Sequence, residues 1–136
     1  MKFSLLTRGD YDIIDITGKV AEKVRAPAVK SGICLISCSC STCGITTMEY
    51  EPNLVADFQE FLRKLIPCDK DYRHNRTWDD ANAHSHIGSS LLKPFLTVPI
   101  DNGEPTLGSW QQIVFIDFDN RPRRREVLIK IVNSEK

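Results

Sequence analysis

The chain has 136 residues, 41% hydrophobic and 26% charged, which is typical of a globular protein long enough to bury its own core. Eighteen basic residues balance eighteen acidic ones, so the net charge gives no reason to expect nucleic acid or an anionic membrane as a partner. No segment approaches the roughly 18 apolar residues that span a bilayer, and no export signal is visible. We therefore expect a cytoplasmic protein with a single domain over residues 1–136.

Short apolar runs bounded by turn residues predict strands at residues 2–6, 11–16, 33–40 and 45–50. Thr17 can cap a helix that extends toward Lys30, and Pro27 ends or kinks this helix. The clearest helix spans residues 52–66, where apolar side chains recur at spacings of three and four until Pro67 stops the pattern.

Residues 68–90 lack periodicity and are rich in polar and aromatic side chains, including all three histidines. Long loops in compact proteins tend to be functional or disordered, and the aromatic content favours an ordered, functional loop. Strands are predicted to follow at residues 95–100, 112–118 and 125–132. The whole pattern predicts an α+β fold of packed, mainly antiparallel β-sheets with two principal helices.

The strand at residues 112–118 is apolar on both faces. Ile113 and Phe115 face one way, whereas Val114, Ile116 and Phe118 face the other. Such a strand is covered twice, either by its own domain or by a neighbouring subunit, and the sequence leaves this choice open.

Five cysteines, an odd number, argue against a framework of disulfides and predict reduced thiols. Cys34, Cys38 and Cys40 share one face of a predicted strand, and Cys43 follows. A Cys-x-Cys-x-x-Cys run can hold zinc or an iron–sulfur cluster, although this spacing matches neither zinc ribbons nor ferredoxins well. Packing of small thiols inside a sheet is commoner, and we favour that interpretation.

His74, His84 and His86 lie within thirteen residues of one another. In an extended segment, His84 and His86 would point to the same face and could chelate one ion. Asp79 and Asp80 could orient the imidazole rings or ligate the ion directly. Loop histidines that bond only to the backbone are the alternative interpretation.

The basic run at residues 121–125 holds four arginines, of which only alternate ones can share a site on a strand. The guanidinium fork suits phosphate or carboxylate. A solvated strand edge or salt bridges between subunits would explain the same run.

Seven short motifs follow one another in a specific order: Thr-Cys-Gly-Ile-Thr-Thr-Met-Glu at 42–49, Tyr-Arg-His at 72–74, Asp-Ala-Asn-Ala-His-Ser-His at 80–86, Ser-Ser-Leu-Leu at 89–92, Leu-Thr-Val-Pro at 96–99, Leu-Gly-Ser-Trp-Gln at 107–111 and Arg-Pro-Arg at 121–123. Together they resemble the YjbQ family, also called UPF0047 or the secondary thiamine-phosphate synthase family, over residues 10–132. Each motif alone is weak, but the combination is highly specific.

The resemblance implies an α+β fold, usually a homotrimer, with a histidine cluster that binds a divalent metal near the subunit boundary. Zinc is the expected ion, with Mg²⁺ as the ion that could serve during turnover. His74, His84 and His86 match family histidines. Glu49 matches the acidic residue after the Gly-Ile-Thr strand, and Trp110 matches the tryptophan of the Gly-x-Trp-Gln motif.

Cys40 departs from the family pattern, in which a histidine usually begins a His-Thr-Thr-Ala-Gly motif. A thiolate can replace an imidazole as a zinc ligand, so Cys40 joins the three histidines in the predicted metal site. A proton-transfer role carries over less directly, because an unperturbed thiol titrates near pH ~8.5.

We therefore expect a metal-dependent enzyme that acts on small phosphorylated metabolites and resembles thiamine-phosphate synthase. Glu49 or Asp80 is the expected catalytic carboxylate. The expected substrate contacts are Ser89, Ser90, Trp110 and Arg123. The alternative is a non-catalytic trimeric protein that binds a phosphorylated metabolite or a structural metal. Neither nucleic acid nor a membrane is an expected partner.

Overall fold

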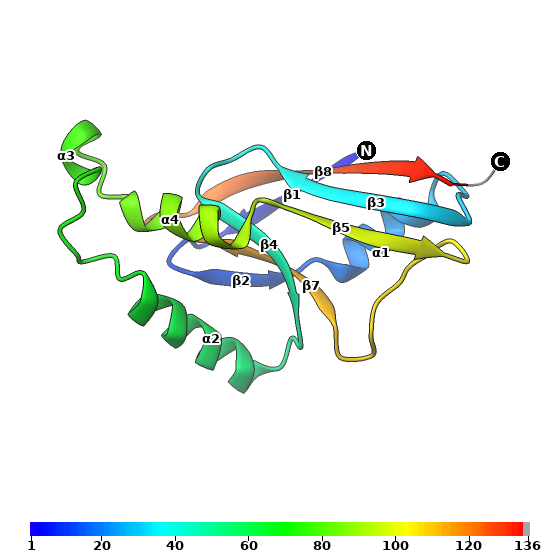
Figure 1. Ribbon diagram of the computed structural model, residues 1–136, viewed down its shortest axis with the longest axis horizontal. Coiled ribbons are helices and arrows are strands. Elements are labelled where there is room, and N and C mark those ends of the chain that lie inside the picture. Colours follow the sequence, from blue (N-terminus) through cyan, green and yellow to red (C-terminus); the bar gives the residue numbers. More distant parts are fainter. Residues whose placement is uncertain (135–136) are drawn as a thin grey trace.

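Eight strands and four helices make up residues 1–134, the part of the chain that the computed structural model describes (Figure 1). The strands are β1 (Lys2–Thr7), β2 (Asp12–Asp15), β3 (Ser31–Cys38), β4 (Cys43–Met48), β5 (Phe95–Asp101), β6 (Glu104–Pro105), β7 (Gln112–Asp117) and β8 (Arg123–Asn133). The larger sheet has the order β1-β8-β3-β5-β6, and the smaller sheet has the order β2-β7-β4. The pairings described in both sheets are antiparallel, which confirms the predicted α+β class.

The helices are α1 (Thr17–Arg25), α2 (Pro52–Leu65), α3 (Asn75–Trp78) and α4 (Ala83–Leu92). Thr17 is the first residue of α1 rather than its cap, and the helix ends two residues before Pro27. At the start of α2, the Glu51 carboxylate accepts hydrogen bonds from the backbone N–H groups of Asn53 and Leu54 at 2.9 and 2.8 Å. The longest helix, α2, has 14 residues, and within residues 1–134 no helix meets the length and hydropathy of a membrane span.

The prediction of one irregular loop over residues 68–90 is wrong, because α4 occupies its end. The sequence of α4 contains a glycine and three serines, which are weak helix formers, and it shows no apolar stripe. Tertiary contacts stabilise the helix instead. Ser85 Oγ donates a hydrogen bond to the Phe118 carbonyl at 2.7 Å, and the Ile45 N–H donates to the Lys93 carbonyl just beyond the helix at 2.9 Å.

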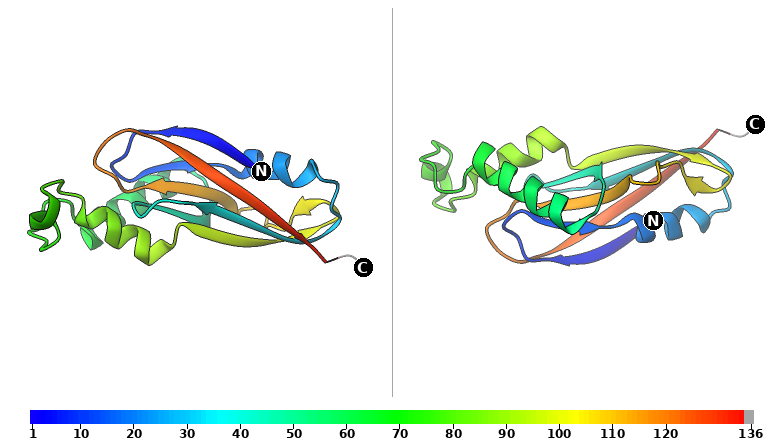
Figure 2. Two further views of the ribbon diagram at one scale, coloured as in Figure 1. Left: turned by 90° about the horizontal axis from the view of Figure 1, so that it is seen from above. Right: turned by 90° about the horizontal axis from the view of Figure 1, so that it is seen from below.

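The chain itself covers both faces of β7, which answers the question that the sequence left open. Ile113 and Phe115 belong to the apolar cluster between the two sheets, together with residues of α1. Val114 and Ile116 face the other way and pack in a second cluster with Leu62 of α2. Figure 2 shows α2 lying across this outer face of the smaller sheet. The molecule is therefore layered as larger sheet, smaller sheet and helix.

Gly88 lets α4 approach the smaller sheet closely. A Cβ atom built at this position would lie 2.7 Å from Cδ1 of Phe118, which is nearer than such atoms tolerate. Phe118 is fully buried and belongs to the same apolar cluster as Leu62. The absence of a side chain at position 88 therefore sets the distance between α4 and the smaller sheet. It also sets the positions of the other side chains on α4.

Substitution of this glycine tests the packing. We expect Gly88→Ala to lower the free energy of unfolding by about 1–3 kcal/mol, because the new methyl group overlaps the Phe118 ring. Gly18→Ala in α1 is the matched control, since no atom lies within 4 Å of the place its methyl group would take, and it should stabilise the protein by up to about 1 kcal/mol. Urea unfolding followed by circular dichroism measures both. Equal effects of the two substitutions would contradict the close packing.

Candidate active site

His86 of α4 lines two hollows. Helices α3 and α4 lie toward one end of the molecule (Figure 1). The first hollow, of about 360 Å³, is lined by Cys40, His86, Ser89, Ser90 and Lys93 among others, and we call it the serine hollow. The second, of about 510 Å³, is lined by Lys70, Arg73, His74, Ala83 and His86 among others, and we call it the basic hollow. The structure thus gathers five of the predicted site residues in one region.

His74 and His86 lie side by side. Their ring centroids are 4.9 Å apart and the rings meet edge to face. His74 immediately precedes α3 and makes no capping bond with its side chain. The side-chain oxygen of Asn75 accepts a hydrogen bond from the Ala83 N–H at 3.0 Å, which ties α3 to the start of α4. Among residues 1–134, the buried Nε2 atom of His74 has no hydrogen-bond partner. A buried imidazole nitrogen without a partner, next to a second imidazole, can ligate a metal ion through its lone pair. In its protonated form the same nitrogen can donate a hydrogen bond to an anion.

His84 does not join this pair, and the expectation that three imidazoles meet at one point is wrong. Its segment is helical rather than extended, so His84 and His86 project about 200° apart around α4. The His84 side chain is only 2% exposed, and its ring centroid lies 5.9 Å from that of Tyr11. Burial lowers the pKa of His84 below its ordinary value. His84 therefore packs as a neutral ring in the interior.

Cys40 lines the serine hollow but forms a disulfide with Cys43, which corrects the expectation that all thiols are reduced. Cys34 and Cys38 are buried free thiols in the apolar cluster between the sheets, as the packing interpretation predicts. Cys68 is a free thiol on the surface. In this oxidation state, the sulfur of Cys40 is not available to a metal.

Ser89 and Ser90 line the serine hollow together with Lys93, which the sequence did not place near them. Ser89 is buried, and its carbonyl accepts a hydrogen bond from the Lys93 N–H at 2.8 Å, which ends α4. Lys93 has a positive φ of 67°, which turns the chain from α4 into β5. The sequence predicts a loop here, and a loop does not fix where Lys93 lies. The end of α4 places this lysine beside the two serines.

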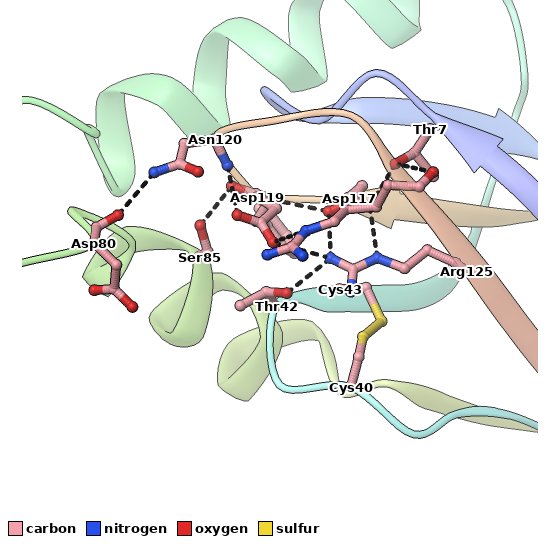
Figure 3. A network of polar contacts seen from close by, with 12 residues as sticks. Thr7, Cys40, Thr42, Cys43, Asp80, Ser85, Asp117, Asp119, Asn120 and Arg125 are labelled. Carbon is pink, nitrogen blue, oxygen red and sulfur yellow. Dashed lines mark hydrogen bonds and ion pairs between the residues drawn. A yellow bond between two sulfur atoms is a disulfide. The ribbon is translucent and has the colours of Figure 1, made fainter. Parts of the chain in front are cut away.

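Glu49 and Asp80, the predicted catalytic carboxylates, lie outside both hollows. Glu49 is exposed and follows β4 on the way to α2. Asp80 is exposed in the turn between α3 and α4, and its backbone carbonyl accepts a hydrogen bond from the Asn120 side chain at 2.9 Å. Figure 3 shows the Asp80 carboxylate pointing away from the neighbouring polar network.

Trp110 and Arg123, two predicted substrate contacts, are also placed elsewhere. Trp110 lies in the connection between β6 and β7 and is 75% exposed. Arg123 lies on β8, where its Nε donates to Asp119 Oδ2 at 2.8 Å. A single chain therefore does not bring either side chain to His86.

A buried network of charges lies near the Cys40–Cys43 disulfide (Figure 3). Arg125 donates to both carboxylate oxygens of Asp117, at 2.8 and 3.0 Å, and to Thr42 Oγ1 at 2.8 Å. Thr7 Oγ1 donates to Asp117 at 2.6 Å. Asp119 adds a further carboxylate 3.4 Å from the same guanidinium. The basic run at residues 121–125 was the sequence signal for this network, but the sequence did not show which carboxylates its arginines pair with.

Asp119 is held in its charged form. Burial alone would raise the pKa of its carboxyl group, but the Asn120 N–H and the guanidinium of Arg123 outweigh burial and lower the pKa below the ordinary value. The Asn120 N–H and Arg123 Nε bonds are both 2.8 Å long. Asp119 therefore contributes a negative charge to the network at neutral pH, and the guanidinium groups of Arg123 and Arg125 balance the two carboxylates.

The protein is an α+β protein in which two antiparallel sheets stack on each other and a helix covers the outer sheet. Its polar site surrounds a pair of histidines at one end. Residues 1–134 match the profile described as UPF0047 protein YjbQ-like. The chain belongs to the YjbQ/UPF0047 family, which confirms the resemblance seen in its motifs.

Solved structures share the fold over nearly the whole chain. An uncharacterised conserved protein of this family from Clostridium acetobutylicum has a TM-score of 0.88 and 35% identity, covering 97% of this chain and 99% of that one. A YbjQ-like protein of unknown function from Sulfolobus solfataricus has a TM-score of 0.88 and 26% identity, covering 98% and 97%. A UPF0047 protein from Archaeoglobus fulgidus is 37% identical over 130 residues, covering 96% and 98% of the two chains. The family is one of unknown function, so the activity has to be argued from the site.

The buried pairing can be tested by removing its cation. Arg125→Met should lower the free energy of unfolding by about 3–5 kcal/mol, because it leaves the Asp117 carboxylate buried without its partner. Arg124→Met, on the neighbouring exposed position of β8, is the control and should change stability by no more than about 0.5 kcal/mol. Chemical unfolding of both variants at neutral pH decides the matter. A small loss for Arg125→Met would mean that the pairing contributes little.

Ionisation of Asp119 should make the free energy of unfolding depend on pH in acid. Because its pKa is lower in the folded than in the unfolded chain, its contribution is present above the unfolded value and is lost as pH falls below about 4 through the folded value. Asp119→Asn should flatten the pH dependence in that window. Unfolding free energies measured from pH 7 to pH 2 test this, with the exposed Asp101→Asn as a control. An unchanged slope in Asp119→Asn would refute the assignment.

Proposed function

We propose that this protein is a metal-dependent enzyme that acts on phosphorylated metabolites, with a thiamine-phosphate synthase-like transfer as the reaction. One observation carries the proposal: His86 separates a hollow rich in basic groups from a hollow lined by hydroxyl groups. A transfer between two phosphorylated substrates needs positive charge for the phosphate of one, and positive charge with hydroxyl donors for the diphosphate of the other.

The basic hollow suits a phosphate group. Lys70 and Arg73 line it, and its one lining carboxylate, Asp71, is paired with Arg76. Ala83 places the N-terminal end of α4 at the same hollow, where the helix dipole favours an anion. These charges act locally, which agrees with a chain of zero net charge.

His74 and His86 are the proposed metal ligands. The unpartnered Nε2 of His74 and the adjacent His86 ring fit a divalent ion such as zinc, with Mg²⁺ as the alternative during turnover. The ion would supply charge that stabilises a departing diphosphate. His84 is left out because it is buried, and Cys40 is left out while its disulfide stands.

In the proposed transfer, the ring nitrogen of a thiazole phosphate bonds to the methylene carbon of a pyrimidine-methyl diphosphate. The bond between this carbon and the diphosphate oxygen breaks, and the diphosphate leaves with the electron pair. Lys93 and the hydroxyl groups of Ser89 and Ser90 would neutralise and hold the leaving group in the serine hollow. Positioning and charge, rather than a catalytic carboxylate, would carry this reaction.

A homotrimer is part of the proposal. Leu6, Trp110 and Val132 are large apolar side chains that are 76%, 75% and 59% exposed. Exposed aromatic and aliphatic groups of this kind are typical of subunit interfaces. Assembly would also offer Trp110 and Glu49, which lie away from the hollows of their own chain, to the site of a neighbouring subunit.

A non-catalytic trimer that binds a phosphorylated metabolite or a structural metal is the second candidate. The placement of both predicted carboxylates, Glu49 and Asp80, away from the two hollows favours it. Binding without turnover needs the basic hollow and the histidine pair but no proton-transfer group.

The ligand assignment is tested by metal content. We expect the protein, purified without reductant and loaded with Zn²⁺, to lose its bound zinc in His74→Ala and in His86→Ala, because each substitution removes one of two neighbouring imidazoles. Without reductant the Cys40–Cys43 disulfide stays closed, so these two cysteines do not contribute. Elemental analysis after desalting gives the ratio of zinc to protein.

His84→Phe is the matched control, since it removes an imidazole from the same helix but keeps an aromatic ring beside Tyr11. It should retain the wild-type zinc content. Unchanged zinc in both His74→Ala and His86→Ala would refute the metal site. Formation of thiamine phosphate from the two substrates then separates the enzyme from the binding protein, because the latter binds inorganic diphosphate without forming product.

A further inference from the structure

Three cysteine sulfurs come together where β3 turns into β4. Cys38 is the last residue of β3, Cys43 is the first of β4, and Cys40 lies in the turn between them. The three Sγ atoms all lie within 4.8 Å of one another. In tetrahedral zinc sites the Zn–S distance of about 2.3 Å places the sulfurs about 3.8 Å apart. No pair of these sulfurs is therefore more than about 1 Å farther apart than that spacing, and Cys40 and Cys43 are closer because they are bonded to each other.

The turn that carries these sulfurs is fixed by bonds to three other parts of the chain. The Cys38 N–H donates to the Pro94 carbonyl at 2.9 Å, and the Thr42 carbonyl accepts from the Phe118 N–H at 3.0 Å. Arg125 holds the Thr42 side chain at 2.8 Å. A backbone held on both sides of Cys40 keeps the three side chains together whether or not two of them are bonded.

We propose that reduction of the Cys40–Cys43 disulfide opens a three-thiolate site for a soft divalent ion such as Zn²⁺, formed by Cys38, Cys40 and Cys43. The Cys-x-Cys-x-x-Cys spacing contains a Cys-x-x-Cys pair, which is common to zinc sites and redox-active disulfides. The site shares no ligand with the histidine pair, although Cys40 and His86 line the same hollow, so it goes beyond the proposed function. It also gives the free thiol of Cys38 a role that packing alone does not require.

Reduction starts at the exposed sulfur. Cys40 is half-buried and lines the serine hollow, whereas Cys43 is fully buried. A thiolate of a small dithiol attacks Cys40 Sγ, the bond between the two cysteine sulfurs breaks, and Cys43 leaves as a thiolate. The second thiol of the reductant then closes on the first sulfur, releases Cys40 as a thiolate and leaves a cyclic disulfide of the reductant.

Metal binding then follows without a further oxidant or reductant. The ion displaces the remaining thiol protons from the three cysteines, so binding releases protons to the solvent. Three protein ligands leave a fourth tetrahedral position, and the serine hollow beside Cys40 gives a water molecule or a small ligand access to it. The reverse exchange with the cyclic disulfide of the reductant, which is itself reduced to the dithiol, closes the Cys40–Cys43 bond, removes two of the three ligands and releases the ion.

Cobalt(II) is the probe for this site, because thiolate ligands give it an intense charge-transfer band in the near ultraviolet that imidazole ligands do not give. The full chain is reduced with a dithiol, freed of reductant under nitrogen and titrated with Co²⁺. We expect one ion per chain with this band in the reduced protein and no such band in the oxidised protein. Thiol counting under denaturing conditions should give three free thiols before reduction and five after it, as the disulfide requires.

Cysteine variants test the three ligands one by one. Cys38→Ala, Cys40→Ala and Cys43→Ala should each weaken cobalt binding by about 100-fold or more, since even a partner outside the ligand shell contributes 10–100-fold. Cys34→Ala is the matched control, because Cys34 lies on the same strand, is equally buried and is not one of the three sulfurs. Cys68→Ala controls for loss of an exposed thiol, and both controls should bind as the wild type does.

Two results would overturn the proposal: no charge-transfer band in the reduced wild-type protein, or a band that survives Cys43→Ala. The oxidised wild-type protein is a control without any substitution, so a variant that fails to fold does not leave the question open. Cobalt that binds without the charge-transfer band in both oxidation states, and is lost in His86→Ala, would support the histidine site and reject the thiolate site. The two proposals can therefore fail separately.

Discussion

The double hydrogen bond between Arg125 and Asp117 is the interaction on which the arrangement of the two sheets depends. Arg125 belongs to β8 in the larger sheet, whereas Asp117 ends β7 in the smaller one. Thr7 of β1 adds a third bond to the same carboxylate. Moving such charges out of water costs several kcal/mol, which only a well-fitting set of partners offsets. We infer that the pairing selects one alignment of the sheets, because a slipped alignment would leave both charges buried and alone.

The residue after Asp117 transmits this alignment to the candidate site. The Phe118 N–H donates to the Thr42 carbonyl, in the turn that carries the cysteines, and the Phe118 carbonyl accepts from Ser85 of α4. The Phe118 ring fills the space under Gly88. One residue thus fixes both walls of the serine hollow: the cysteine turn on one side and α4 on the other. A strand end that holds a turn and a helix at a set distance preorganises the site between them.

The sequence predicted those features that depend on local periodicity. The two faces of β7 could be assigned because alternate residues of a strand face opposite ways, and the same residues form the two clusters of the structure. The helix α4 could not be predicted, since its stability comes from contacts with Phe118 and β4 rather than from its own residues. The error over His84 followed directly, because residues two apart share a face only in a strand. The partnership of Asp117 with Arg125 joins two sheets, and no local pattern encodes such a contact. The family motifs nevertheless placed His74 and His86 together in one site, since a resemblance carries tertiary information that periodicity lacks.

The two proposed sites place opposite demands on the charge of the serine hollow, and the oxidation state of Cys40 decides between them. With the disulfide closed, the sulfur wall is neutral, and the cationic side chains of Lys93 and the basic hollow set the local potential, which attracts phosphate. Opening the disulfide adds thiolates to that wall, and three thiolates with one divalent ion still carry a net negative charge that repels a phosphate nearby. We infer that the oxidised chain is the better binder of a phosphorylated ligand and the reduced chain the better binder of a soft metal. A histidine at position 40 would have no such oxidised and reduced pair of states, so the cysteine at this position makes the site respond to the redox conditions around it.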